Sequence, residues 1–237
     1  MLLALWSPKG GSGTSVLAAA CSLVLARRGP TGVRLADLDG DQPALFGLAH
    51  DPETGLADWL DAGPTAPPEA LARFAIEAAP GVVLLPRGRG GGALAPQAAA
   101  EAGAALAVTL RDDPLSTVID LGRAEAPAAR AVLEIADAAV LVTRGCYLTL
   151  RRAARAPGLA RTSGVAMLEE AGRSLDAKAV ADVLGLPVVA RVPVRAGVAQ
   201  AVDAGVLPSR LPDQLARPAT HLLMAFGLLP SSRGRAA

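Results

Sequence analysis

Short apolar runs alternate along the chain with longer helix-like stretches, and most of the runs end at Gly, Pro or Asp. This alternation is typical of βα units in a mostly parallel sheet. It predicts strands at residues 2–6, 33–37, 82–85, 117–121, 138–143, 165–168 and 188–192. Helices are predicted at residues 15–28, 55–62, 68–79, 96–110, 127–135, 148–156, 176–184 and 196–204, with a short terminal helix at 219–226.

Right-handed connections between parallel strands turn this order into an α/β fold, a three-layer, doubly wound sandwich. The 237 residues suit a single domain over 1–229, followed by a disordered tail at 230–237. Hydrophobic residues make up 51% of the chain and aromatic residues only 3%, so the core is expected to consist of Ala, Val and Leu. Ligands of such a fold bind at the carboxyl ends of the strands.

Net charge and cysteine content restrict the cellular compartment in which the protein is expected, but they do not identify a binding partner. The net charge of +1 argues against a strongly polybasic surface. Cys21 and Cys146 lie far apart and lack metal-type spacing, so both are expected to be free thiols, with Cys146 packed in the interior. No apolar run reaches the roughly 18 to 20 residues of a membrane span. A reduced, cytoplasmic protein is therefore expected.

The segment between the first strand and the first helix has the composition of a phosphate-binding loop. Glycines let several backbone amides converge on one anion, and the N-terminus of the following helix adds a partial positive charge. The hydroxyl of Ser15 stands where a P-loop residue binds Mg²⁺. The candidate nucleotide-binding residues are Lys9, Gly10, Gly11, Ser12, Gly13, Thr14 and Ser15.

This loop departs twice from the usual pattern G-x-x-x-x-G-K-[ST], because Pro8 replaces the first glycine and Thr14 replaces the lysine. Lys9 nevertheless supports the interpretation of this segment as a phosphate-binding loop. Lysine occurs only at positions 9 and 178 among the 23 Lys and Arg residues, and one of the two lies in the phosphate loop. A slim ammonium group suits a phosphate in a way that Arg does not easily replace. The alternative is a solvated loop lysine beside a structural glycine turn.

Carboxylates stand at the ends of two predicted strands, where a P-loop protein needs them to hold metal and orient water. Asp37 and Asp39 follow the second strand, and Asp120 ends an apolar run in the manner of a Walker B strand. Asp120 is therefore a candidate Mg²⁺ ligand acting through water. The plainer alternative is that Asp37 and Asp39 only solvate a strand end or cap a helix.

The segment Lys9-Gly-Gly-Ser-Gly-Thr-Ser15 resembles the deviant Walker motif K-G-G-x-G-K-[ST] of the ParA/MinD family. The resemblance extends over most of residues 1–211, although only the phosphate loop is specific. It implies a P-loop NTPase fold, ATP or ADP with Mg²⁺ as ligands, and a homodimer in which Lys9 reaches the partner's phosphates. It also implies that Asp39 contacts the attacking water and that Asp37 supports the loop. The lost lysine is most similar to the CpaE/TadZ pilus-assembly branch.

Two departures bear on activity. The family usually reads adenine with an Asn after the sixth strand, where this chain has Glu169 and Glu170. The missing lysine removes a charge-assisted contact of about 1.5–3 kcal/mol, or about ten- to hundredfold in affinity. Binding should therefore survive better than hydrolysis, and the chain would be a weak ATPase at most.

Three surface segments have open interpretations. Arg151, Arg152, Arg155 and Arg161 form either a solvated helix face or a patch for nonspecific DNA binding. The Gly-rich segment 87–92 is either a mobile loop at the active face or a plain connector. The apolar residues 222–226 are expected to pack on the domain, with peripheral membrane contact as the alternative.

Three functions compete on this sequence. The first is a nucleotide-dependent dimeric switch that positions a pilus or secretion apparatus, or a chromosome or septum, through a protein partner of that system. The second is a non-enzymatic scaffold that keeps the fold and has lost useful nucleotide binding, which Thr14 and Glu169 favour. The third is a dinucleotide-dependent oxidoreductase, because Gly11, Gly13 and Asp37 partly imitate its fingerprint, although Val16 replaces the third glycine.

Overall fold

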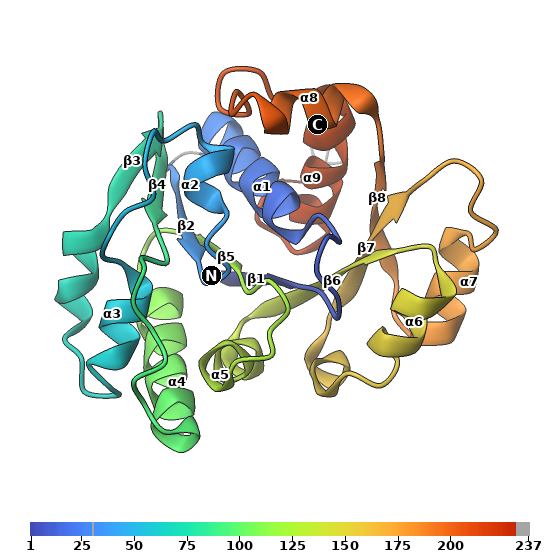
Figure 1. The fold of residues 1–237 in the computed structure, drawn as a ribbon. Helices are drawn as coiled ribbons and strands as arrows, with labels where there is room; N and C mark the ends of the chain where they lie inside the picture. The colour runs from blue at the N-terminus through green and yellow to red at the C-terminus, as the bar shows by residue number, and fades with distance from the viewer. Residues whose placement is uncertain (30, 231–237) are drawn as a thin grey trace, which may run out of the picture.

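A computed structural model describes residues 1–29 and 31–230 of the chain, and it is built around one eight-stranded sheet (Figure 1). The strand order is β3-β4-β2-β5-β1-β6-β7-β8, and every neighbouring pair is parallel except β3 and β4. The strands are β1 (Leu2–Trp6), β2 (Val33–Asp37), β3 (Ile76–Ala79), β4 (Val82–Leu85), β5 (Thr117–Asp120), β6 (Ala138–Arg144), β7 (Gly164–Glu169) and β8 (Val188–Pro193). The predicted doubly wound α/β fold is confirmed.

Helices cover both faces of this sheet. The α-helices are α1 (Thr14–Arg28), α2 (Gln42–Leu45), α3 (Leu56–Asp61), α4 (Pro96–Asp112), α5 (Pro127–Ile135), α6 (Tyr147–Ala153), α7 (Ala177–Leu184), α8 (Ala196–Asp203) and α9 (Asp213–Ala225). Two 3₁₀-helices, η1 (Pro68–Phe74) and η2 (Pro157–Arg161), lie among them.

The core has two layers because successive side chains of each strand point to opposite faces of the sheet. Leu3 and Leu5 of β1 pack with α1, α2, α8 and α9 on one face. Leu2, Ala4 and Trp6 pack with α3, α4, α5, α6 and α7 on the other. Figure 1 shows these two groups of helices above and below the sheet. All of β1 is buried, so the loop that follows it starts from the centre of the molecule.

One predicted helix is wrong in its second half. The helix expected at 68–79 is the 3₁₀-helix η1 followed by the edge strand β3, which pairs antiparallel with β4. The short connection at Pro80 and Gly81, with Gly81 at φ 76°, suits a tight hairpin rather than a helix end. Pairing with β4 therefore outweighs the helix propensity of the Ala-rich segment.

The last helix is longer than predicted. Helix α9 begins at Asp213 rather than near residue 219 and contains Pro218 in its interior. Leu215, Leu222 and Leu223 are buried against α1 and β8, and this packing offsets the backbone hydrogen bond that Pro218 cannot donate. Packing of the apolar segment 222–226 on the domain is confirmed. The predicted tail, apart from Pro230, lies outside the described residues.

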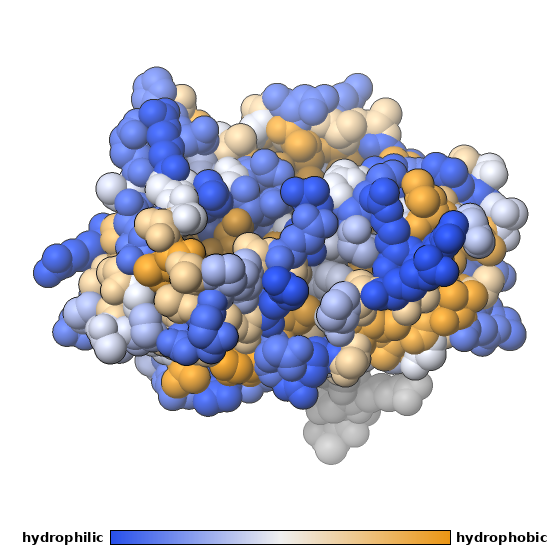
Figure 2. All heavy atoms as spheres, turned by 60° about the horizontal axis from the view of Figure 1, so that its bottom comes forward, coloured by the Kyte–Doolittle hydropathy of each residue, from blue (hydrophilic) through white to orange (hydrophobic). Residues whose placement is uncertain are grey.

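Outside the core, the surface is mixed in character. Figure 2 shows hydrophilic side chains between small apolar patches on the face that is lowest in Figure 1. Arg151, Arg152, Arg155 and Arg161 are all exposed, and Arg161 pairs with Glu134. Within the described ranges, no helix is long and apolar enough to span a membrane.

Candidate functional site

The turn between β1 and α1 forms one wall of a cleft of about 280 Å³. The walls include residues 10–15 from the predicted phosphate loop, together with Asp39, Asp41, Arg123 and Arg144. The side chains of Ser12, Thr14 and Ser15 are almost completely buried, whereas Gly10 and Gly11 are exposed. The turn is therefore lined largely by backbone on its open side.

Gly13 fixes the shape of this turn. Its φ of 78° lies in the left-handed region, which side chains rarely adopt. A Cβ atom there would also lie 2.9 Å from Cδ2 of Leu168 on β7. The glycine thus lets the start of α1 approach the neighbouring strand closely.

Unpaired backbone amides give the turn its chemistry. Within the part of the chain that the structure describes, the amides of residues 10–16 donate to no protein acceptor, and the first bond of α1 runs from Leu17 N to Gly13 O at 3.0 Å. The hydroxyl of Ser12 stabilises the turn by donating to the carbonyl of Lys9 at 2.7 Å. Free amides at a helix N-terminus suit an anion such as a phosphate chain.

Two buried carboxylates lie beneath the cleft. Asp37, at the end of β2, accepts hydrogen bonds from the amides of Asp39, Gly40 and Gln42 at 2.7–3.0 Å. Asp37 therefore holds the loop that carries Asp39. Asp120 accepts from the amide of Gly122 at 3.0 Å and from Nε2 of Gln42 at 2.8 Å.

Burial governs the protonation of this pair. Removal from water raises the pKa of Asp37 to about 7, the negative charge of Asp120 adds to the rise, and the three amides oppose it. Burial likewise raises the pKa of Asp120 to about 6, although hydrogen bonds from Gln42 and Ser15 favour its ionised form. Oε1 of Gln42 is buried beside them without a partner among the described residues.

The oxygens that suit Mg²⁺ face the cleft from two elements. The hydroxyl of Ser15 lies 3.5 Å from Oδ2 of Asp41, and Asp39 and Asp41 both line the cleft. Hydroxyl and carboxylate oxygens are the ligands that Mg²⁺ prefers, so this donor set fits the ion. Asp120 lies deeper, because its side chain is fully buried. Sequence reasoning missed Asp41.

Three arginines that the sequence did not single out lie in or beside the cleft: Arg123 and Arg144 line it, and Arg87 lines an adjoining pocket that shares Asp39 and Asp41 with it. Arg87 comes from the segment 87–92, Arg123 follows β5 and Arg144 ends β6. Burial and Asp41 raise the pKa of Asp39, whereas the charges of Arg123 and Arg87 lower it. Residues 87–89 of the Gly-rich segment line the pocket that adjoins the cleft, and the amides of Leu56 and Ala57 of α3 donate to the carbonyls of Pro86 and Arg87.

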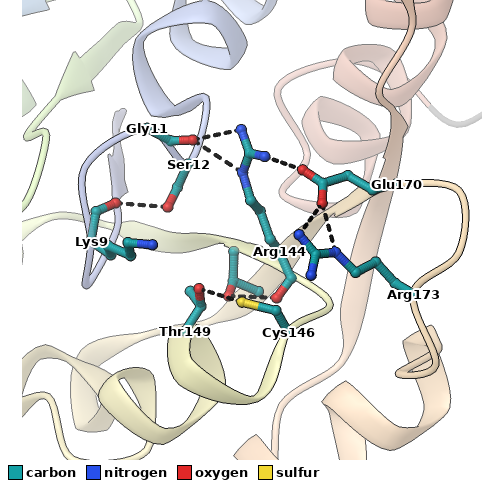
Figure 3. Close-up of polar contacts among 9 residues, drawn as sticks. Lys9, Gly11, Ser12, Arg144, Cys146, Thr149, Glu170 and Arg173 are labelled. Atoms are coloured by element: carbon teal, nitrogen blue, oxygen red, sulfur yellow. Dashed lines mark hydrogen bonds and ion pairs between the residues drawn. The ribbon is translucent and has the colours of Figure 1, made fainter.

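Arg144 bridges the phosphate loop and β7. Its Nε and Nη2 donate to the carbonyl of Gly11 at 3.1 and 2.7 Å, and its Nη1 pairs with Glu170 (Figure 3). Glu170 also pairs with Arg173 at 2.6 Å, and Glu169 pairs with Arg191. The two glutamates at the position expected for an adenine-reading Asn are therefore both in ion pairs.

Lys9 and Cys146 lie at the edge of the same region (Figure 3). Lys9 is exposed. Cys21 is buried as expected, but Cys146 is partly exposed, so its predicted interior packing is wrong. The reason is its position at the N-terminus of α6, where its Sγ lies 3.0 Å from Oγ1 of Thr149. Hydrogen bonding to Thr149 is the main cause of its lowered pKa, and Arg173 and Lys9 add to the effect.

Comparison with known proteins relates this geometry to a fold. No protein-family model matches the chain, and no curated protein matches it. Among solved structures, a ParA family ATPase from Chlorobium tepidum superposes with a TM-score of 0.74 at 20% identity, covering 92% of this chain and 95% of its own. The septum site-determining protein MinD from Pyrococcus horikoshii, complexed with Mg-ADP, gives 0.74 at 18% identity, covering 95% of both chains.

A third solved structure carries a nucleoside triphosphate. The ATP complex of a single-residue variant of McdA from Cyanothece superposes with a TM-score of 0.73 at 16% identity and covers 97% of both chains. The TM-scores and coverages of these superpositions establish a shared fold over nearly the whole length of the chain. The chain therefore has the P-loop α/β fold of the ParA and MinD ATPases.

Proposed function

We propose that this protein binds ATP with Mg²⁺ in the cleft at the β1–α1 turn and acts as a nucleotide-dependent positioning protein of the ParA/MinD type. The observation that carries the proposal is the row of unpaired amides at residues 10–16 at the mouth of a cleft. Ser15 of the same segment and Asp39 and Asp41 after β2 supply oxygens for Mg²⁺. The nucleotides in the MinD and McdA structures support the same ligand class.

Dimerisation is the proposed output of binding. Lys9 is exposed beside the cleft rather than folded into it, so its ammonium group is available to the phosphates of a second copy. An ATP molecule contacted by both protomers would couple nucleotide state to assembly, because ligand binding to the dimer alone shifts the equilibrium toward it.

Turnover is proposed to be slow. Asp39 lines the cleft and is the candidate for orienting the attacking water. Thr14 supplies no charge at the usual lysine position, so stabilisation of the transferred phosphoryl group is weaker. A long-lived ATP state suits a switch.

The cargo is proposed from the loop's resemblance to the CpaE/TadZ branch: a pilus or secretion apparatus, reached through a protein partner. Genes for such an apparatus beside this gene would support that assignment. A neighbouring gene for a centromere-binding protein would favour chromosome or plasmid segregation instead.

Light scattering tests the switch directly. The molar mass of the purified protein is measured with and without ATP and Mg²⁺, for the native chain and for Lys9→Ala. We expect ATP with Mg²⁺ to double the molar mass of the native protein and to leave the molar mass of Lys9→Ala unchanged.

Lys178→Ala is the matched control, because Lys178 is the only other lysine and pairs with Asp182 on the surface of α7. It should dimerise like the native protein. Two results together would contradict the proposed switch. The molar mass of the native protein would not change with ATP and Mg²⁺, and Lys9→Ala would still recruit its protein partner normally.

A non-enzymatic scaffold is the second candidate, and one contact favours it. Gln42 covers Asp120 with a 2.8 Å hydrogen bond, and Asp120 is fully buried. A carboxylate held in this way is poorly placed to serve a metal-bound water. Calorimetric titration with ATP and Mg²⁺ distinguishes the two proposed functions, because a micromolar dissociation constant would contradict the proposal of a scaffold that has lost nucleotide binding.

A further inference from the structure

The phosphate loop lacks its usual lysine, yet a guanidinium group lies against it from another strand. Thr14 occupies the lysine position, and its side chain is almost completely buried. Arg144 arrives from the end of β6, lines the same cleft and contacts the loop at the carbonyl of Gly11. The two features are 130 positions apart in sequence and meet only in the fold.

We propose that Arg144 supplies to the phosphates of the bound nucleotide the positive charge that Thr14 cannot. This inference rests on the proposed nucleotide binding, and it identifies Arg144 as a residue that determines the affinity for the nucleotide. A guanidinium group is always charged and presents a rigid set of donors to phosphate oxygens.

The hydrogen-bond count leaves Arg144 free to act in this way. A guanidinium group has five N–H donors. Nε and one N–H of Nη2 are used by the carbonyl of Gly11, and one N–H of Nη1 is used by Glu170. One N–H remains on each terminal nitrogen. The side chain is 36% exposed, so these donors remain accessible from the cleft.

The local charge balance also favours an anion. Glu170 lies between Arg144 and Arg173 and makes an ion pair with each (Figure 3). One carboxylate between two guanidinium groups leaves one positive charge uncompensated. Of these two guanidinium groups, only that of Arg144 lines the cleft, and it also contacts the phosphate loop.

Calorimetric titration with ATP and with inorganic pyrophosphate, each with Mg²⁺, tests the role. Replacing Arg144→Ala should weaken both ligands by about ten- to hundredfold, the usual size of a lost charge-assisted contact. The matched control is Arg191→Ala, which removes the ion-pair partner of Glu169 outside the cleft and should change affinity by less than about threefold. Arg144→Gln carries the same comparison if Arg144→Ala does not fold.

A rescue experiment separates charge from mere support of the loop. Adding Thr14→Lys to Arg144→Ala returns an ammonium group to the usual position and should recover at least about tenfold in affinity. If Arg144 only supported the loop, Thr14→Lys would raise the affinity by the same factor in Arg144→Ala as in the native protein; a shared charge role predicts a larger factor in Arg144→Ala.

The outcomes are distinct. If the native protein binds ATP and Arg144→Ala binds it within about threefold, the inference fails while the proposed function stands. A gain from Thr14→Lys that is no larger in Arg144→Ala than in the native protein also overturns the inference. If the native protein binds neither ATP nor pyrophosphate, the proposed function fails and the inference fails with it.

Discussion

Nε2 of Gln42 donates a 2.8 Å hydrogen bond to Oδ2 of Asp120, and both side chains are fully buried. The same nitrogen donates to the carbonyl of Ser15 at 3.0 Å. One side chain therefore links the β2 loop, the first turn of α1 and the end of β5. These are the three segments that form the floor of the cleft.

Replacing Gln42→Ala should destabilise the protein. It removes the donor to Oδ2 of the buried carboxylate of Asp120 and leaves only the amide of Gly122 on Oδ1, which costs about 1–3 kcal/mol of unfolding free energy. Urea denaturation followed by circular dichroism measures the change. Gln200→Ala, at an exposed position on α8, is the control and should change stability by no more than about 0.5 kcal/mol. Equal effects of the two substitutions would contradict the role assigned to Gln42.

A methyl group at Gly13 should strain the phosphate loop. Gly13→Ala combines a φ of 78° with a Cβ atom 2.9 Å from Leu168, so a loss of about 1–3 kcal/mol is expected. Gly10→Ala is the matched control, because a Cβ atom there meets nothing within 4 Å. Thermal unfolding of both variants checks the difference. Similar melting temperatures would show that the turn can relax.

Restoring the lysine at position 14 should strengthen nucleotide binding. Thr14→Lys adds a charge-assisted contact to the phosphates, which corresponds to about ten- to hundredfold in ATP affinity. Thr65→Lys adds the same charge at an exposed position and should have little effect. Titration of ATP and Mg²⁺ into each variant gives the comparison, and an unchanged affinity for Thr14→Lys would argue against phosphate binding in this loop.

Glu170 should give the fold a dependence on pH. The hydrogen bond from Arg173, helped by the charge of Arg144, holds its pKa below the usual value. Because the folded pKa lies below the unfolded one, ionised Glu170 stabilises the fold at neutral pH, and this contribution disappears as the pH falls through the folded pKa. Arg144 on β6 and Arg173 after β7 are the charged groups that face it.

The measurement compares Glu170→Gln with the native protein by urea denaturation. The variant should be less stable at neutral pH, and the difference should shrink as the pH falls through the lowered pKa of Glu170. Glu77→Gln, on the exposed side of β3, should show no such convergence. A gap between native protein and Glu170→Gln that stays constant with pH would exclude this linkage.

The sequence predicted the fold well because its signals are local. The buried strands are continuous apolar runs, and the phosphate loop combines glycines with a rare lysine over a few positions. Strand β3 was missed because its four residues follow a helix-like segment and depend on pairing with β4. The start of α9 was missed because its packing on α1 overrides the local effect of Pro218.

The arginines of the cleft could not be found in the same way. Most of the 23 basic residues are arginines, so no single one stands out locally. Arg87 and Arg123 follow β4 and β5, and Arg144 ends β6. Arg123 and Arg144 meet at the cleft, with Arg87 in the adjoining pocket, only because these parallel strands end at one edge of the sheet. Their order along the chain carries no sign of that proximity.

The donors that face the cleft at residues 10–16 are main-chain groups, which every residue except proline carries. Mutation of a side chain in this loop can change the affinity of the loop for an anion, but the main-chain donors remain in the polypeptide. Substitutions that keep the turn, such as the one at Thr14, can therefore accumulate during evolution while the location of the ligand stays constant. Natural substitutions in this loop should then change the affinity for the ligand and the rate of any hydrolysis before they abolish binding of the ligand.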